Sequence, residues 1–201
     1  MKDSLLMRDS TEGDGKAEIV MDYVLSYSLR HAEDKFLVDK PMLCRYCRYM
    51  LGSLLEIPIN DNTNIVSVKV WKEWRNIDLC VEVVIKDEIE HTYALLIENK
   101  YYSKLQDNQL ERYKQIYDAY YDKHGVPEEN RRYKLISCLE NKEQVNKRYG
   151  LKTEKVPPKK KQEFTARPFY DLLPNKYWHE DKREYEETES EIFNEFWLRK
   201  W

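Results

Sequence analysis

The sequence lacks any apolar run long enough to cross a lipid bilayer, and its four histidines are scattered singly along 201 residues. No histidine has a neighbour with which it would form a catalytic pair. The start of the chain, residues 1–4, also lacks the apolar stretch and cleavage site of a secretory signal peptide. We therefore expect a soluble protein that is located in the cytoplasm.

Cysteine is scarce, and its four positions predict no disulfide scaffold. Cys80 and Cys138 fall within predicted strands, where small buried thiols are common. Cys44 and Cys47 have the spacing of half a zinc site, but no second Cys-x-x-Cys and no paired histidine follows at a suitable distance. The cysteines therefore indicate a reducing compartment, and they do not predict zinc.

The chain has no excess of basic residues, since 34 Lys and Arg stand against 37 Asp and Glu. Because the net charge is −3, nucleic-acid binding would need a local basic patch. A hydrophobic content of 41% argues against wholesale disorder, and the length suits one ordinary core. No internal repeat is visible.

The chain divides into a flexible N-terminal arm, residues 1–15, and a single domain, residues 16–201. Within the domain, apolar residues nearly encircle a helix over 17–29, which predicts that it is largely buried. A second helix begins at Pro41, and residues 141–163 form an exposed lysine-rich loop around Pro157 and Pro158. Residues 164–173 predict a last strand with a short helical turn.

The C-terminal segment 188–201 is expected to form a helix that docks on an apolar surface. Thr188 and Glu191 have the spacing of a capping box, and four apolar residues share one helical face: Ile192, Phe193, Phe196 and Trp197. The surface is either the protein's own domain or a second copy of the chain in a homodimer.

Alternating and apolar runs predict a mixed α/β sheet. A half-buried strand over 65–70 turns at 71–75 into a strand over 79–85, and a third strand follows over 93–97. The clearest helix runs from Asp107, a candidate cap, to His124. It is a crossover to a strand over 132–139, which is therefore parallel to the third strand. The expected fold is a three-stranded antiparallel meander with an added parallel strand, flanked by helices.

Asp78, Glu98 and Lys100 stand at the ends of two facing strands of this meander. Because strand side chains repeat every two residues, Glu98 and Lys100 share a face, and Asp78 lies opposite them. Two carboxylates could bind a hard cation such as Mg²⁺, and the lysine could orient a water or offset charge on a phosphate. The alternative is a structural ion pair, although charges seldom end a strand as buried as Leu95–Ile97 without partners.

The arrangement of Asp78 and Glu98-Asn99-Lys100 resembles the PD-(D/E)XK nuclease superfamily, which has the restriction-endonuclease-like fold. Ile77 replaces the proline that names the motif, at a position that varies in the superfamily. The resemblance covers roughly residues 16–173 and includes three further positions. Gln109 and Tyr113 are similar to a Gln-x-x-x-Tyr element of the exonuclease branch, and Glu18 is similar to an additional acid on the leading helix.

The resemblance implies that Asp78, Glu98 and the Asn99 carbonyl hold Mg²⁺ or Mn²⁺, that Glu18 assists, and that Lys100 positions water. Gln109, Tyr113, Arg112 and Lys104 are expected to contact substrate, and further phosphate contacts would come from Arg131, Arg132 and the lysines of 155–161. Two of these residues could instead serve the fold alone. Tyr113 also belongs to an apolar stripe with Leu110, Ile116, Tyr117 and Tyr120, and Glu18 could be an acid that stabilises a first helical turn.

The implied activity is metal-dependent hydrolysis of the DNA backbone, in a branch of small stand-alone bacterial proteins linked to restriction or phage defence. This step rests on the family analogy. One alternative is a catalytically inactive module of the same fold that binds nucleic acid or a protein. Another is a structural protein built around its 16 tyrosines and aromatic C-terminal helix.

Overall fold

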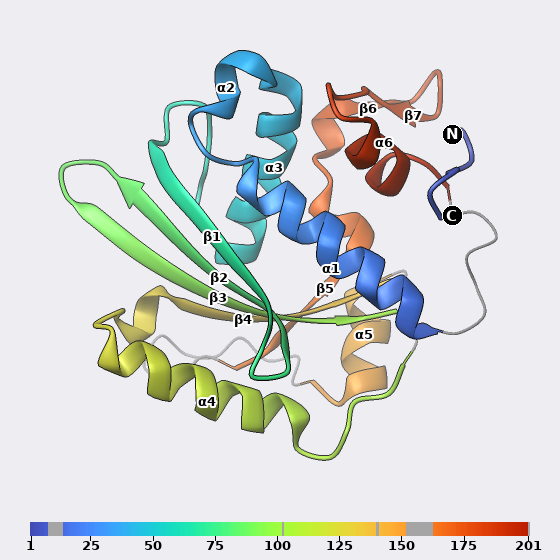
Figure 1. Ribbon diagram of the computed structural model, residues 1–201. Coiled ribbons are helices and arrows are strands. Elements are labelled where there is room, and N and C mark those ends of the chain that lie inside the picture. The colour runs from blue at the N-terminus through green and yellow to red at the C-terminus, as the bar shows by residue number, and fades with distance from the viewer. Residues whose placement is uncertain (8–13, 102, 140, 152–162, 201) are drawn as a thin grey trace.

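The computed structural model describes residues 1–7, 14–101, 103–139, 141–151 and 163–200. Its centre is a five-stranded sheet with helices on both faces (Figure 1). In spatial order the strands are β1 (Ile65–Trp74), β2 (Ile77–Lys86), β3 (Glu90–Lys100), β4 (Arg131–Ser137) and β5 (Thr165–Pro168).

The sheet is antiparallel at one side and parallel at the other. β1, β2 and β3 form a meander, β4 lies parallel to β3, and β5 lies parallel to β4. The connection from β3 to β4 runs through a helix, as a parallel neighbour requires. The predicted mixed α/β class and the order of the first four strands are therefore confirmed, and the arrangement is consistent with a restriction-endonuclease-like fold.

Two layers of helices cover the sheet (Figure 1). α1 (Asp14–Arg30), α3 (Pro41–Leu55) and α6 (Glu191–Trp197) lie on one side, with the short α2 (Phe36–Asp39) leading into α3. α4 (Gln109–Lys123) crosses the other side, and α5 (Lys142–Tyr149) lies beside β5. The remaining short elements are the 3₁₀ turns η1 (Glu128–Asn130), η2 (Phe169–Leu172) and η3 (Asn175–Tyr177) and the hairpin β6 (Trp178–His179) with β7 (Glu184–Tyr185).

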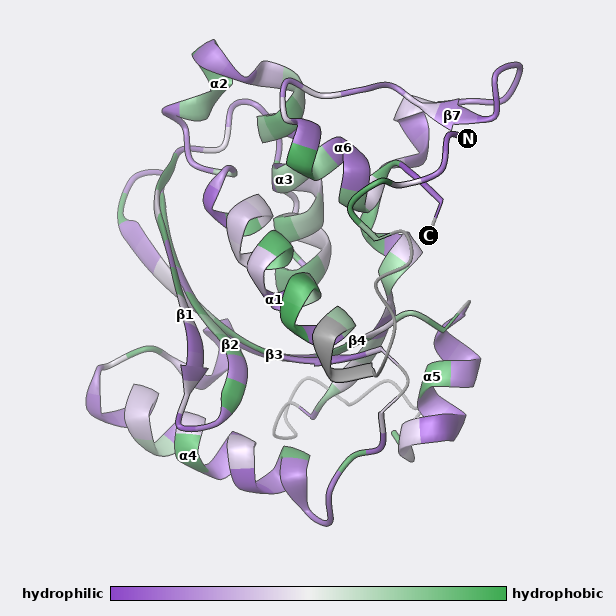
Figure 2. Cartoon of the chain, turned by 45° about the vertical axis from the view of Figure 1, so that its right-hand side comes forward, coloured by the Kyte–Doolittle hydropathy of each residue, from purple (hydrophilic) through white to green (hydrophobic). Residues whose placement is uncertain are grey.

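The sheet separates two hydrophobic cores. Leu95 and Ile97 of β3 belong to the core under α1 and α3, whereas Ala94 and Leu96 belong to the core under α4. Figure 2 shows the contrast, with α1 and α3 rich in hydrophobic residues and α4 mostly hydrophilic. β3 is thus buried on both faces, as its continuous apolar run predicted.

α4 differs from its prediction at its start and in its buried stripe. Asn108, in the left-handed region at φ 54°, precedes the first helical residue, and its side chain makes no capping hydrogen bond, so Asp107 is not the cap. The buried residues follow a spacing of four, and they are Gln109, Tyr113, Tyr117 and Tyr121. Of the predicted stripe, Tyr113 and Tyr117 are buried, and Leu110, Ile116 and Tyr120 are partly buried against the same core.

The turn between β1 and β2 is tighter than predicted. Trp74 still pairs with Ile77, so only Arg75 and Asn76 connect the strands. Both connecting residues have positive φ, at 54° and 65°, as a two-residue hairpin turn that matches the twist of the strands requires. β1 therefore runs through the segment 71–74, which was expected to be a turn.

The lysine-rich segment 141–163 opens with a helix that was not predicted. The Asn141 side chain accepts from the Gln144 amide at 3.0 Å, and the Gln144 side chain accepts from the Asn141 amide at 3.2 Å. This capping box starts α5, so the segment contains a helix-start signal in spite of its polar composition. Residues 152–162, including Lys155, lie outside the described residues.

The C-terminal helix packs on its own chain, which is one of the two alternatives that the sequence left open. Trp197 stacks on Phe169, with ring centroids 4.1 Å apart, and its indole donates to Ser28 Oγ at 3.0 Å. The helix cap is Ser190 rather than Thr188, and Ile192 is exposed rather than part of the buried face. The aromatic face is therefore occupied within the chain, and a homodimer through it has no support.

The N-terminal residues meet the C-terminal segment. Asp3 forms a bridge with Lys200, and the Glu195 carboxylate accepts from Ser4 Oγ and from the main-chain amides of Leu5 and Leu6. Residues 8–13 of the predicted arm lie outside the described residues. Within the described ranges, no helix combines the length and the apolar character needed to span a membrane.

Candidate active site

The ends of β2 and β3 bring Asp78 and Glu98 together. Leu79 pairs with Ile97 across the two antiparallel strands, so the next residues, Asp78 and Glu98, meet at the same end of these strands. The main-chain amide of Asn99 donates to Asp78 Oδ2 at 2.8 Å, which ties the first carboxylate to the second strand. The facing arrangement expected from the sequence is present.

Glu98 is the most buried acid of the group, with no exposed surface. Its Oε1 accepts from Lys100 Nζ at 2.7 Å and from Gln109 Nε2 at 2.6 Å. Its other oxygen, Oε2, is buried and accepts no hydrogen bond from the residues that the structure describes. A buried carboxylate oxygen without a partner is costly, so it marks a place where a proton or a cation would stabilise the site.

The two carboxyl groups repel each other in a desolvated place. Burial, followed by the charge of Asp78, raises the pKa of Glu98 to about 8. Burial also raises the pKa of Asp78, although the Asn99 amide and Lys100 oppose the rise. Acids that share a site ionise together only if positive charge is supplied. The pair therefore holds a proton near neutral pH unless a cation replaces it.

Lys100 is the cation nearest to these carboxyl groups, and 7% of its surface is exposed. Burial alone would lower its pKa, but the charge and hydrogen bond of Glu98, with smaller contributions from Glu18 and Asp78, raise it overall. Its Nζ lies 3.8 Å from Glu18 Oε2. Lys100 is consequently held as an ammonium among three acids.

Glu18 joins α1 to the chain that leaves β3. Its Oε1 accepts from the Tyr101 amide at 2.8 Å and from the Ser103 hydroxyl. α1 begins at Asp14, so Glu18 is its fifth residue and lies beyond the first helical turn. The alternative role of Glu18 as a first-turn acid is therefore wrong, and its carboxylate lies beside Lys100.

Asp22 is a member of the group that the sequence interpretation missed. It lies one turn after Glu18 on α1, and its Oδ1 accepts from Asn99 Nδ2 at 2.6 Å. Burial, with repulsion from Asp78 as the second cause, raises its pKa to about 7. The i, i+4 spacing of two acids on one face of α1 is the signal that could have identified it.

The four predicted substrate contacts divide between the interior and the surface. Gln109 is buried and reaches Glu98, and its Nε2 also lies 3.3 Å from the Tyr113 hydroxyl. Arg112 is exposed on α4, with its guanidinium 5.5 Å from the ring centroid of Tyr113. Lys104 is exposed in the connection between β3 and α4. Gln109 therefore contacts Glu98 directly, whereas Arg112 and Lys104 lie at the surface.

Arg131 does not have the position expected of a phosphate contact. It is buried, donates to the Val126 carbonyl at 2.6 Å and pairs with Asp122 at 2.7 Å. Its guanidinium fastens the end of α4 to β4, so the predicted phosphate role was wrong. Arg132 donates to the Leu55 carbonyl at 2.8 Å and belongs to the opposite end of the sheet from Lys100.

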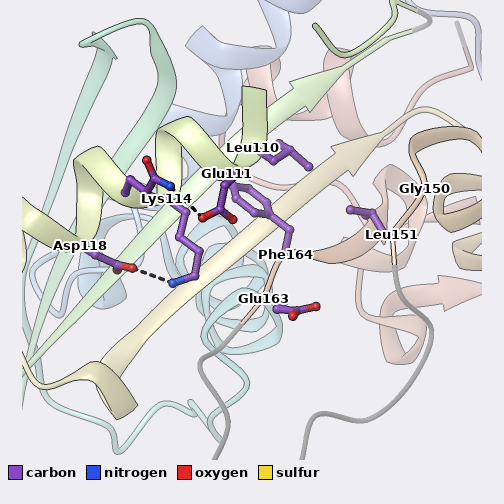
Figure 3. A pocket seen from close by; sticks show the side chains of 9 residues that line it. Leu110, Glu111, Lys114, Asp118, Gly150, Leu151, Glu163 and Phe164 are labelled. Atoms are coloured by element: carbon purple, nitrogen blue, oxygen red, sulfur yellow. Dashed lines mark hydrogen bonds and ion pairs between the residues drawn. The ribbon is translucent and has the colours of Figure 1, made fainter. Parts of the chain in front are cut away.

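A separate hollow of about 460 Å³ lies between α4, the end of α5 and the start of β5 (Figure 3). Lys114 and Asp118, which line it, form an ion pair of 2.6 Å across one turn of α4, and Phe164 closes part of its wall. None of the acids of the candidate site lines this hollow. The acids at the strand ends and this hollow are therefore in different places.

The donor set suits a small hard cation. Mg²⁺ uses oxygen ligands and commonly keeps several waters while one or two carboxylates hold it. Asp78 and Glu98 supply two carboxylates, and the unpaired Glu98 Oε2 is an oxygen ready for a cation. Within the described ranges no three His, Cys, Asp or Glu side chains form a group that could hold a metal by themselves. The residues therefore fit a hydrated Mg²⁺ or Mn²⁺ better than a metal enclosed by protein.

Comparison with known proteins agrees with this geometry. A family model described as the PD-(D/E)XK nuclease superfamily matches residues 22–162. The match begins at Asp22 and contains Asp78, Glu98, Lys100 and Gln109, whereas Glu18 precedes it. No curated protein and no solved structure has significant similarity to the chain.

Proposed function

Because the chain belongs to the PD-(D/E)XK nuclease superfamily, we propose that it is a metal-dependent nuclease that hydrolyses phosphodiester bonds in DNA. The observation that carries the proposal is the convergence of Asp78, Glu98 and Lys100 at one end of strands β2 and β3. Glu98 is completely buried, and beyond the neighbouring Asp78 carboxyl its Oε2 has no hydrogen-bond partner among the described residues. Burying this carboxylate oxygen without a further partner costs free energy, and a bound cation would offset that cost.

Asp78, Glu98 and the main-chain carbonyl of Asn99 would hold the metal. When bound, Mg²⁺ or Mn²⁺ lowers the pKa of a water and offsets charge on the phosphate. The carboxyl groups must both be ionised to accept it, so the proton that the pair carries in the free protein leaves. Glu18 and Asp22, both on α1, add negative charge at the same edge of the site.

Lys100 is the residue that we assign to the reacting water and phosphate. Its ammonium is fixed by Glu98 and stays charged, because the surrounding acids raise its pKa. A fixed positive charge stabilises the negative charge that develops in the transition state more than it stabilises the substrate. Removal of one such group from an active site typically lowers kcat by about 10²–10³-fold.

Gln109 is a positioning residue in this scheme. Its side-chain amide donates to Glu98 Oε1, the oxygen that Lys100 also contacts, and its carbonyl accepts from the Gln106 amide at 3.0 Å. Both ends of the amide are therefore held. Gln109 leaves Oε2 as the unpaired oxygen of Glu98 and fixes the direction in which it points.

The proposal is tested by incubating the protein with labelled single- and double-stranded DNA in Mg²⁺ or Mn²⁺. We expect cleavage that chelation abolishes and that Glu98→Gln lowers at least about 100-fold. Glu82→Gln is the matched control, because Glu82 lies on the neighbouring strand and pairs with Lys69 at 3.6 Å, away from the acids. Cleavage that persists unchanged in Glu98→Gln would show that another site or a contaminant is responsible.

The second candidate function is a module that binds nucleic acid or a protein without turnover. It predicts binding to DNA with no cleavage in any divalent cation, and a Glu98→Gln variant that binds as the original protein does. The complete set of two acids and a lysine favours the nuclease, because a module without turnover has no need of all three.

A further inference from the structure

Asn99 stands between Glu98 and Lys100 on β3, but its side chain lies on the other face of the sheet. Strand side chains alternate between the two faces. Ile97, two residues earlier, belongs to the core under α1 and α3, whereas Glu98 accepts a hydrogen bond from Gln109 of α4. Asn99 is completely buried, and its side chain faces α1.

The main chain of Asn99 serves the candidate active site. Its amide donates to Asp78 Oδ2 at 2.8 Å. In an extended strand the N–H and C=O of one residue point to the same side, so the Asn99 carbonyl, which we assign to the metal, lies on the side of Asp78. The orientation of Asn99 therefore fixes one carboxylate and directs one further oxygen.

α1 holds this end of β3 at two points. Asp22 Oδ1 accepts from Asn99 Nδ2 at 2.6 Å, and Glu18 Oε1 accepts from the Tyr101 amide at 2.8 Å. Four residues of a helix span about 6 Å, and two residues of a strand span about 6.6 Å. The spacing of the two acids on α1 therefore matches the spacing of the two residues that they contact.

The amide of Asn99 is only partly satisfied. Its Oδ1 is buried and accepts no hydrogen bond from the residues that the structure describes. A buried amide with one polar end unpaired costs free energy, which an apolar side chain of similar size would avoid. The hydrogen bond that the amide makes with Asp22 therefore explains why an amide stands at this position.

We propose that Asp22 is a positioning residue, which acts through Asn99 to keep its main-chain amide on Asp78 and its carbonyl directed at the metal. The inference rests on the proposed nuclease function. Gln109 holds Glu98 from α4, so two consecutive residues of β3 are each held by a helix on a different face of the sheet (Figure 1). The role of Asp22 requires an oxygen that accepts a hydrogen bond, rather than a negative charge.

The test is a titration of the protein with Mn²⁺ in the absence of DNA, in which free Mn²⁺ is measured by electron paramagnetic resonance. Asp22→Ala should weaken Mn²⁺ binding by about 10- to 100-fold, the usual effect of losing a contact that orients a metal ligand. Asn99→Ala removes the same hydrogen bond from the other side and should have a similar effect. Asp22→Asn should retain most of the affinity, because its amide oxygen accepts the same hydrogen bond.

A double variant shows whether Asp22 acts through Asn99. Asp22→Ala/Asn99→Ala should bind Mn²⁺ no more weakly than Asn99→Ala alone, because the second change removes a contact that is already lost. Additive losses would overturn the inference. Equal losses in Asp22→Asn and Asp22→Ala would also overturn it, since they would show that the charge of Asp22 acts on the metal directly.

Asn130→Ala is the matched control. Asn130 Nδ2 donates to the Thr92 carbonyl at 3.1 Å, so this side chain also fastens β3, but near its first residues and away from the acids. We expect Mn²⁺ binding equal to that of the original protein. A loss as large as that of Asn99→Ala would show that any loosening of β3 weakens the metal site, which contradicts a specific role for Asp22.

The two proposals fail in different ways. If Mn²⁺ binding depends on Asp22 and Asn99 but no divalent cation supports cleavage of DNA, the positioning role stands and the nuclease function fails. If metal-dependent cleavage is lost in Glu98→Gln but Asp22→Ala binds Mn²⁺ as the original protein does, the nuclease function stands and the positioning role fails. In a cleaving enzyme, Asp22→Ala should raise the Mn²⁺ concentration needed for half-maximal activity and leave the KM for DNA unchanged.

Discussion

Glu98 and Lys100 lie two residues apart on one face of β3, and Lys100 Nζ contacts Glu98 Oε1 at 2.7 Å. Both side chains are almost entirely buried, at 0% and 7% exposure. Removal of one partner from a buried pair leaves the other as an uncompensated charge, which then takes up or loses a proton. The stability and the chemistry of this pair can therefore be separated only by changing both residues.

Lys100→Met should lower DNA cleavage at least about 100-fold while the protein still folds near neutral pH, because Glu98 becomes neutral when its cation is lost. Its melting temperature should fall steeply at pH 9, where the buried carboxyl is forced to ionise. The double variant Lys100→Met/Glu98→Gln should recover the melting temperature at pH 9 but not the cleavage. Cleavage that survives in Lys100→Met would remove this lysine from the mechanism.

Gln109→Leu should lower kcat by about tenfold with little change in KM, because its amide positions Glu98 rather than binding substrate. Loss of the donor should also raise the pH at which the metal-dependent activity appears, since one hydrogen bond that favours the ionised Glu98 is missing. Gln115→Leu is the matched control, because Gln115 lies on the exposed side of the same helix, where its amide donates to Glu111 Oε1 at 3.0 Å. A change in KM alone would contradict the positioning role.

The metal-free protein should become less stable as the pH rises from about 4.5 to about 8. The pKa of Glu98 is raised from its ordinary value of 4.5 to about 8 in the folded protein, so the folded state binds more protons than the unfolded state in this window. Its contribution to stability is present below pH 4.5 and is lost as the pH passes through 8, with a slope of up to ~1.4 kcal/mol per pH unit.

Mn²⁺ should reverse this loss, because it replaces the proton between the two acids. The rise in melting temperature on adding Mn²⁺ to chelator-treated protein should therefore be larger at pH 8 than at pH 5.5. Glu98→Gln should flatten the pH dependence of the metal-free protein and remove most of the Mn²⁺ effect. An equal Mn²⁺ effect at both pH values would show that binding displaces no proton from these carboxyl groups.

Trp197→Ala should lower the free energy of unfolding by about 3–5 kcal/mol, because the indole is 2% exposed and stacks on Phe169. Ile192→Ala on the same helix should cost under about 0.5 kcal/mol, since Ile192 is exposed. Urea unfolding measures both values. A Trp197→Ala variant that keeps its stability but changes its sedimentation would indicate an intermolecular role for this helix, contrary to the packing within the chain.

The strand and helix periods of the sequence were sufficient to predict the sheet and the two strands that carry the acids. Apolar runs determine which segments are buried on both faces, and the two-residue repeat then places Glu98 and Lys100 together. Asp78 followed from the same rule across a hairpin. These are local properties, so they can be derived without knowing how the helices pack.

Short-range signals were less reliable where several competed. Asp107, Asn108 and Gln109 all stand near the start of α4, and the helix begins only where the Gln109 side chain can also reach Glu98. At the C-terminus, Thr188 and Ser190 both qualify as caps, and packing selects Ser190. The choice among neighbouring residues depends on contacts with distant parts of the chain.

The sequence by itself determined the order of the three meander strands, the shared face of Glu98 and Lys100, and the acid on the neighbouring strand, because each depends on repeats within a strand or hairpin. Only the tertiary structure decided that Asp22 joins the acids and that Arg131 fastens the end of α4 to β4. Those relationships depend on how α1 and α4 lie across the two faces of the sheet, which packing between distant elements sets rather than any local pattern.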